Sequence, residues 1–291
     1  MLAVGVTLAG TAAGWVWAPY SDIVKRVAPP ERRPFLLAVV NTGTSAGFLM
    51  IGMLALLATL SSWRLVWLGT ALAAAAAAVA NLRFVPRLGP ATAGRAFDTR
   101  SLRRRSMLLP LAYSVAYSAG CTVFFTFASQ SLSNGGMPPA ARAPVFVAVA
   151  TTGVLALCTG RLVAVVGSAQ LAAICVACQG VAIALLATSS GSLRAIVLSS
   201  LVYGVGYMVG GAVLAIWTAE AIAEAPGDAF TAALVVGAVS AIAAPAVIGA
   251  LTATFGLSAL LLAAGAVIGA SALAISLISC CRRDARVGES S

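Results

Sequence analysis

Few residues in this sequence could support catalysis, and their arrangement argues against an enzyme. The chain has no histidine, and its acidic residues form no pair suited to general acid–base catalysis. Cys175 and Cys178 form a CxxC, but no βαβ pattern surrounds it and no second CxxC completes a zinc site. Most of the six cysteines lie within apolar runs, where cysteine packs as a small hydrophobe. The sequence therefore predicts no enzyme activity, no metal site and no cofactor.

Four tyrosines are the more informative polar groups, because they lie well inside long apolar runs. Tyr113 and Tyr117 are four residues apart, so they share one helix face. Tyr203 and Tyr207 repeat this spacing, and Phe124 extends the first stripe by two helical turns. A phenol in hydrocarbon needs a hydrogen-bond partner, which a wet cavity or a neighbouring helix can supply. Two interpretations follow: these residues line a pathway through the membrane, or they pack one helix on another.

These aromatic residues must be held by helices that cross a lipid bilayer. Apolar residues make up 61% of the 291-residue chain and charged residues only 9%, against roughly 25% charged in a soluble domain. The mean hydropathy is +1.02. A membrane helix needs about 20 mostly apolar residues, and breaks rich in Pro and Gly separate such runs here. The predicted class is an all-α, polytopic membrane protein with nine spans, at about 1–23, 34–60, 63–82, 107–130, 144–166, 168–189, 193–219, 229–253 and 255–280.

The distribution of basic residues predicts how the chain is oriented. Because successive spans alternate in direction, each connection falls on one of two sides, and fifteen of the 18 basic residues fall on the same side. The excess of Lys and Arg predicts that this side is cytoplasmic, with the C-terminus inside and the N-terminus outside. The net charge of +10 does not indicate nucleic-acid binding, because the arginines separate apolar runs instead of lining one face. High alanine and arginine usage favours a bacterial source, and hence the inner (plasma) membrane.

A long, arginine-rich connection at 83–106 divides the spans unequally. Three spans precede it in 1–82, six follow it in 107–280, and a short cytoplasmic tail, 281–291, ends the chain. We therefore expect two helical bundles joined by a basic cytoplasmic linker. In this linker, Arg103–Arg105 would anchor the next helix to anionic headgroups.

Local motifs occur along this three-plus-six arrangement: PPERR at 29–33, NTGTSAG at 41–47, SWR at 62–64 and GRLVAVVG at 160–167. Their order and spacing resemble the major facilitator superfamily from its fourth to its twelfth transmembrane helix. The resemblance implies a truncated major facilitator fold without the first three helices. One position departs from the family's antiporter motif, because Phe48 stands where that motif has proline. Antiport is therefore not indicated.

The resemblance also implies a function. Members of this family are secondary carriers that move small solutes by alternating access and bind them near the bilayer midplane, between repeats. No charged residue lies near the centre of any predicted span, so a neutral or weakly amphipathic organic solute is favoured. The alternative is a truncated, non-transporting membrane remnant of such a carrier, since three absent helices would remove one wall of the cavity.

Site residues follow from the same resemblance. In this family the first helix of each three-helix unit lines the cavity, which implies a substrate pathway containing Trp15, Tyr113, Tyr117, Phe124, Tyr203 and Tyr207. Charged residues near the predicted cytoplasmic ends imply a gate made of Asp22, Glu31, Arg32, Arg33 and Glu220. Spacings of small residues predict close helix packing at Gly43, Gly47, Gly206 and Gly210. The expected partners are a small-molecule substrate and the lipid bilayer; oligomeric state, substrate identity, transport direction and coupling ion stay open.

Overall fold

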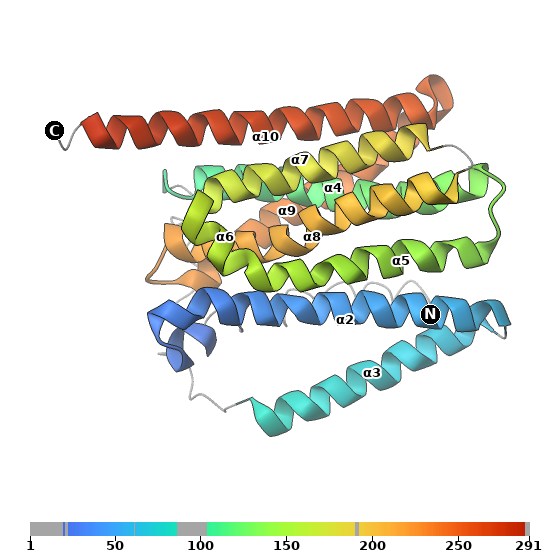
Figure 1. Cartoon of the computed structure of the whole chain (residues 1–291), viewed down its shortest axis with the longest axis horizontal. Helices are drawn as coiled ribbons and strands as arrows, with labels where there is room; N and C mark the ends of the chain where they lie inside the picture. Colours follow the sequence, from blue (N-terminus) through green and yellow to red (C-terminus); the bar gives the residue numbers. More distant parts are fainter. Residues whose placement is uncertain (1–19, 21–22, 61, 86–103, 190–191, 289–291) are drawn as a thin grey trace.

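The computed structural model describes residues 20, 23–60, 62–85, 104–189 and 192–288. Within these residues every regular element is a helix, and Figure 1 shows the long helices lying side by side as roughly parallel rods. Among the described residues, eight segments are long and apolar enough to cross a membrane, which confirms the all-α, polytopic class. Of the first predicted span, 1–23, only positions 20 and 23 are among the described residues. Trp15 and Asp22 therefore lie outside the described residues.

The helices fall before and after the predicted linker, most of which also lies outside the described residues. Before it lie η1 (Pro30–Arg32), α2 (Arg33–Leu60) and α3 (Trp63–Phe84). After it lie α4 (Leu108–Asn134), η3 (Pro139–Ala141), α5 (Arg142–Thr151), η4 (Thr152–Cys158), α6 (Thr159–Val166), α7 (Ser168–Thr188), α8 (Leu193–Ala221), α9 (Pro226–Phe255) and α10 (Leu257–Gly288).

Local sequence explains where several helices begin and end. Ser62 caps α3 by accepting a hydrogen bond from the backbone N–H of Arg64 at 3.3 Å, which satisfies one of the free amides of the first turn. Gly167 and Gly256 separate α6 from α7 and α9 from α10, with φ angles of 85° and 77°. Glycine adopts this conformation without the steric cost that a Cβ would bring. Single residues can therefore reverse the chain between these consecutive spans.

The fifth predicted span is interrupted by a 3₁₀ segment. Sequence periodicity predicts one helix over 144–166, whereas the structure has α5, then η4, then α6. At the start of η4, the hydroxyls of Thr151 and Thr152 donate to carbonyl oxygens three residues earlier, at 2.8 Å and 2.7 Å. Such bonds compete with the regular ladder and bend helices, and Gly153 follows directly. The interruption begins at these three residues.

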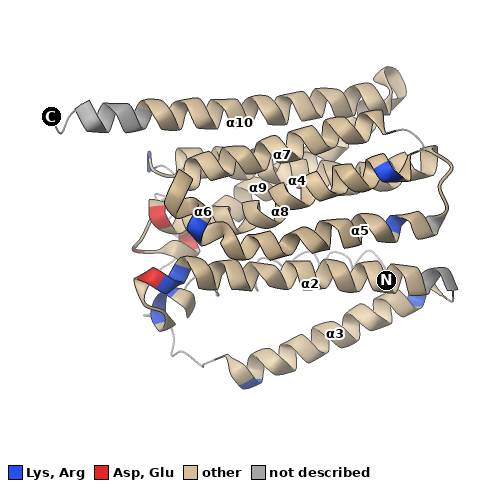
Figure 2. Ribbon diagram, in the orientation of Figure 1, with Lys and Arg blue, Asp and Glu red and all other residues tan. Residues whose placement is uncertain are grey.

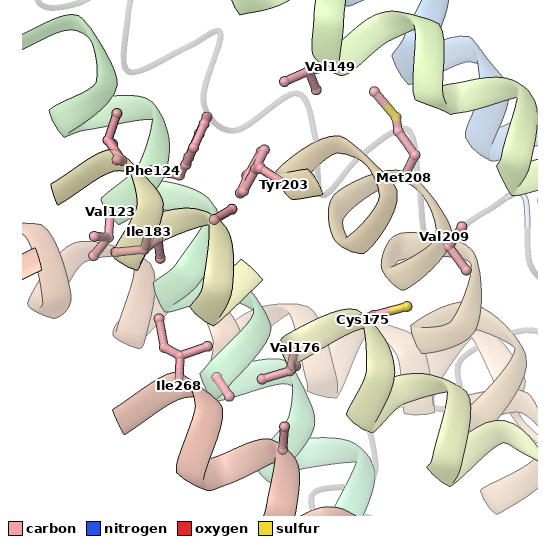
Figure 3. Packing of buried hydrophobic residues seen from close by; sticks show 14 of the residues in the cluster. Val123, Phe124, Val149, Cys175, Val176, Ile183, Tyr203, Met208, Val209 and Ile268 are labelled. Carbon is pink, nitrogen blue, oxygen red and sulfur yellow. The ribbon is translucent and has the colours of Figure 1, made fainter. Parts of the chain in front are cut away.

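The main apolar core is formed by α4, α5, α7, α8, α9 and α10, and α2 packs on its α5 and α8 side. Figure 3 shows part of this core, where Val123, Ile183 and Ile268 from three helices meet. Backbone also approaches backbone closely between α7 and α10: a Cβ on Gly265 would lie 2.7 Å from the carbonyl oxygen of Gly180. At the edge of the bundle, α3 makes its main contacts with α2 and presents the rest of its surface to lipid.

Charged residues gather at one end of the bundle. Figure 2 shows the described acidic residues, together with most of the basic ones, where α2 and α9 begin and α8 ends. Arg64, Arg142 and Arg194 lie at the opposite end. The described charges therefore follow the alternation predicted from the sequence, and we call the crowded end the basic end.

Candidate functional site

The two predicted tyrosine pairs meet in a column of aromatic rings between α4 and α8. Tyr113 stacks on Tyr117 with ring centroids 5.6 Å apart, and Tyr117 stacks on Tyr207 at 6.1 Å. Tyr207 stacks on Tyr203 at 5.6 Å, and Tyr203 lies face to face with Phe124 at 3.8 Å. Figure 3 shows Phe124 and Tyr203 side by side. The column continues through Phe48, Phe125, Phe146 and Trp217.

Three of these tyrosines bond to the backbone of the facing helix. Tyr113 Oη donates to the carbonyl of Gly210 at 3.0 Å, and Tyr117 Oη donates to that of Tyr207 at 2.8 Å. Tyr203 Oη donates to the carbonyl of Cys121 at 3.4 Å. Tyr113 and Tyr203 are fully buried, as is Phe124. These contacts are the ones that the packing interpretation expects, so a pathway role for the three buried rings stays a prediction.

Tyr207 differs from the other three tyrosines. Its ring is half-buried and meets Phe48 of α2 edge to face, with centroids 5.5 Å apart. Among the residues that the structure describes, none accepts or donates a hydrogen bond at its hydroxyl. A phenol inside a membrane span needs such a partner. Tyr207 therefore differs from the other three in having a hydroxyl with no described partner, at the boundary between α2 and α8.

The predicted packing glycines separate into two groups. A Cβ on Gly210 would lie 2.7 Å from both Tyr113 Oη and Tyr117 Cε2, and one on Gly206 would collide with the carbonyl oxygen of Cys175 on α7. These two glycines therefore let α8 approach α4 and α7. No described atom lies within 4 Å of a Cβ on Gly43 or Gly47, so their packing role stays a prediction.

Two buried amides escaped the sequence analysis. Asn41 is only 5% exposed, and its Nδ2 donates to the carbonyl of Met208, which joins α2 to α8. Gln179 of α7 is fully buried and donates from Nε2 to Cys121 Sγ at 3.4 Å. A neutral amide in an apolar run is costly without a partner. Because of that cost, a neutral amide within an apolar run is itself a sequence signal of a buried polar contact.

At the basic end, a junction joins the segment before α2 to the turn between α8 and α9. Lys25 Nζ donates to the carbonyl of Glu224 at 2.6 Å. Arg33 holds the same segment by donating to the carbonyls of Ala28 and Lys25, both at 3.1 Å. Glu224 also pairs with Arg104 at 3.5 Å. The α8–α9 turn is thereby tied to the segment before α2 and to Arg104, near the end of the predicted linker.

A cavity of about 170 Å³ lies within this junction. Of the predicted gate residues, Arg33 and Glu220 line it, whereas the exposed Glu31 and Arg32 do not. Glu220 Oε2 accepts a hydrogen bond from Ser168 Oγ at 2.6 Å. The structure thus brings two predicted gate residues to one cavity, beside Lys25, which the sequence analysis did not select.

The surroundings of Glu224 favour the ionised form of its carboxyl group. The pKa of the Glu224 carboxyl is lowered, first by a hydrogen bond with its own backbone and then by the charge of Arg104. Glu224 therefore stays ionised at neutral pH, in the form that pairs with Arg104. Because the side chain is fully exposed, solvent screens this pair, and the Lys25 contact to the Glu224 carbonyl does not depend on the carboxyl at all.

A comparison with protein-family models decides what these helices belong to. The model described as Major Facilitator Superfamily matches residues 1–245, which is most of the chain. The chain belongs to the major facilitator superfamily. This membership makes it a membrane transporter and not, at the family level, an enzyme. No curated protein matches the chain.

Membership of the major facilitator superfamily identifies the solvent of the helices and the kind of compound that is transported. The polytopic helices lie in lipid, and the transported compound is a small molecule. At the aromatic column and at the basic-end junction, described polar groups from segments far apart in the chain come together.

Proposed function

We propose that this transporter is a secondary carrier that moves a small organic solute by alternating access. The observation that carries the proposal is Tyr207, whose hydroxyl has no described partner and which lies where α2 meets α8. Asn41 of α2 bonds to the backbone of α8 one residue further on. A solute bound there would contact helices from both sides of the predicted linker, which alternating access requires.

The surroundings of Tyr207 favour a neutral or weakly amphipathic solute. Its ring neighbours are Phe48, Phe125, Tyr117 and Tyr203, and no charged residue is among them. Aromatic faces and a single free hydroxyl suit a compound with an apolar body and a hydrogen-bonding group. A carboxylate or phosphate substrate would instead need a cation within the span.

The basic-end junction is proposed as the cytoplasmic gate. The excess of Lys and Arg at this end favours its placement on the cytoplasmic side of the inner membrane, with the C-terminus inside. Contacts such as that between Lys25 and the Glu224 carbonyl hold the segment before α2 against the end of α8. Opening a path to the cytoplasm would break these contacts.

Uptake into proteoliposomes tests the proposal. The full chain is reconstituted and screened with panels of neutral, cationic and anionic organic solutes, and the best solute is then used with variants. Tyr207→Phe deletes the free hydroxyl, and we expect the KM for uptake to rise about 2- to 10-fold, the worth of one neutral hydrogen bond.

Thr70→Val is the matched control, because it also deletes a hydroxyl, but on the outer helix α3, where Thr70 bonds within its own helix. Its uptake should equal that of the wild type. Uptake restricted to anionic solutes, or a Tyr207→Phe variant with wild-type KM, would refute the proposed site.

A further inference from the structure

A second cavity, of about 310 Å³, lies between α2 and the 3₁₀ segment η4. The two elements touch at Ser45 and Gly153, where a Cβ on the glycine would collide with the serine side chain. Along its open side, Leu49, Val154 and Leu157 are 43%, 69% and 39% exposed. Because all of these residues belong to membrane-spanning segments, the cavity is a groove that opens sideways into the bilayer.

The walls of this groove suit hydrocarbon and not a polar solute. Three hydroxyl groups line it. Thr42 and Thr151 each donate to a carbonyl oxygen three residues earlier in their own helices, at 2.6 Å and 2.8 Å, and Ser45 donates to Met208 Sδ at 3.2 Å. Their donor protons are therefore already used. A site for a polar compound needs converging free polar groups, whereas these walls offer methyl and methylene surface.

Arg161 supplies a charge at one end of the groove. It lies four residues beyond Leu157, about 6–8 Å further on across the junction of η4 and α6. Val154 and Leu157 are three apart in the 3₁₀ segment and so share a face, and a spacing of four brings Arg161 to the same side. Beside it, a Cβ on Gly160 would lie 3.3 Å from Pro34, which places this part of α6 next to the first turn of α2, at the basic end. The groove therefore runs from a cation near the membrane surface toward the middle of the span.

Arg161 also needs a counter-ion that the described protein does not provide. It is exposed and lies within the membrane-spanning segment Arg142–Val166. Among the described residues, none forms a salt bridge with it. A guanidinium at this depth extends toward the headgroups, where phosphate matches its geometry with two parallel hydrogen bonds.

We propose that this groove binds an anionic phospholipid, with one acyl chain between α2 and η4 and the phosphate paired with Arg161. The apolar walls, the sideways opening and the cation at the surface end together fit this one occupant. The proposal requires only that the chain lies in a bilayer, so it does not depend on the solute or the gate proposed above.

Native mass spectrometry of the full-length, detergent-purified protein tests this site. The protein is mixed with equal amounts of phosphatidylglycerol and phosphatidylcholine, and we expect bound phosphatidylglycerol to exceed bound phosphatidylcholine. Arg161→Gln should lower the affinity for phosphatidylglycerol about fivefold, the worth of one basic residue near the surface, and leave phosphatidylcholine unchanged. Arg161→Lys should retain most of the preference. Val154→Trp should fill the groove and reduce binding of both lipids.

Matched controls separate this site from general lipid contact. Arg194→Gln removes an exposed arginine at the opposite end of the bundle, and Val181→Trp adds the same bulk to the outer face of α7. Neither should change lipid binding. Equal binding of the two lipids by the wild type, an unchanged preference in Arg161→Gln, or an equal effect of Arg194→Gln would overturn the proposal.

Discussion

Replacing Gly210 by alanine measures how closely α4 and α8 approach. The new methyl group would lie 2.7 Å from both Tyr113 Oη and Tyr117 Cε2, about 0.7 Å short of an ordinary contact. Tyr113 cannot move aside easily, because it is fully buried and its hydroxyl bonds to the Gly210 carbonyl. The two helices must therefore separate, and overpacking of this kind costs about 1–3 kcal/mol.

The higher helix propensity of alanine stabilises the variant and so partly hides the cost of overpacking. Alanine favours a helix over glycine by up to about 1 kcal/mol, so Gly210→Ala alone understates the strain. Gly249→Ala is the matched control, since Gly249 lies inside α9 and no described atom lies within 4 Å of its Cβ position. The difference between the two variants isolates the packing cost.

The assay is thermal or denaturant unfolding of the detergent-solubilised full chain. We expect Gly210→Ala to be less stable than Gly249→Ala by about 1–3 kcal/mol. Combining it with Tyr113→Phe removes one of the two short contacts, so the double variant should lose less stability than the two single changes summed. Equal stability of the two alanine variants, or strict additivity with Tyr113→Phe, would show that the helices are not packed as described.

Other parts of the structure give further predictions. Because the pKa of Glu224 is lowered, the stabilising contribution of its charge is complete above the ordinary glutamate pKa and is lost as the pH falls through the lowered value. The melting difference between wild type and Glu224→Gln should hence stay constant from about pH 8 to about pH 5 and shrink below that. Gly153→Ala should destabilise the chain more than Gly249→Ala in the unfolding assay, because its methyl group meets the Ser45 side chain. Cys280 is exposed near the end of α10, so a membrane-impermeant maleimide should label it in inside-out vesicles and not in right-side-out ones; the reverse result would invert the proposed orientation.

Most of the helices could be predicted because the bilayer imposes a length on them. Apolar runs of about 20 residues are typical of membrane-spanning helices and uncommon elsewhere, and eight of the nine predicted spans have a counterpart among the described residues. The tyrosine spacing of four was informative for a similar reason, since it fixes one face of a helix whatever the neighbour. The interruption at Thr152 was not predicted, because side-chain bonds to the backbone leave the apolar pattern unchanged.

The contacts of the site were harder to predict, since many join a side chain to a backbone carbonyl. Asn41 bonds to the carbonyl of Met208, and Lys25 bonds to that of Glu224, 167 and 199 residues away along the chain. Every residue has a carbonyl, so no residue type in the sequence marks the acceptor. The donor alone is visible, and for Asn41 the cost of an unpaired amide within the span would have been enough to select it.

The close approach of Gly180 and Gly265 limits where the protein can deform. Backbone in contact with backbone leaves no side chain that could change rotamer, so α7 and α10 are expected to travel together as one rigid block during a transport cycle. The boundary between α2 and α8 is built differently, from flat rings that can slide past each other and one amide that can exchange acceptors. Displacement should therefore concentrate at that boundary, and distance probes attached to α7 and α10 should record a constant separation through the cycle.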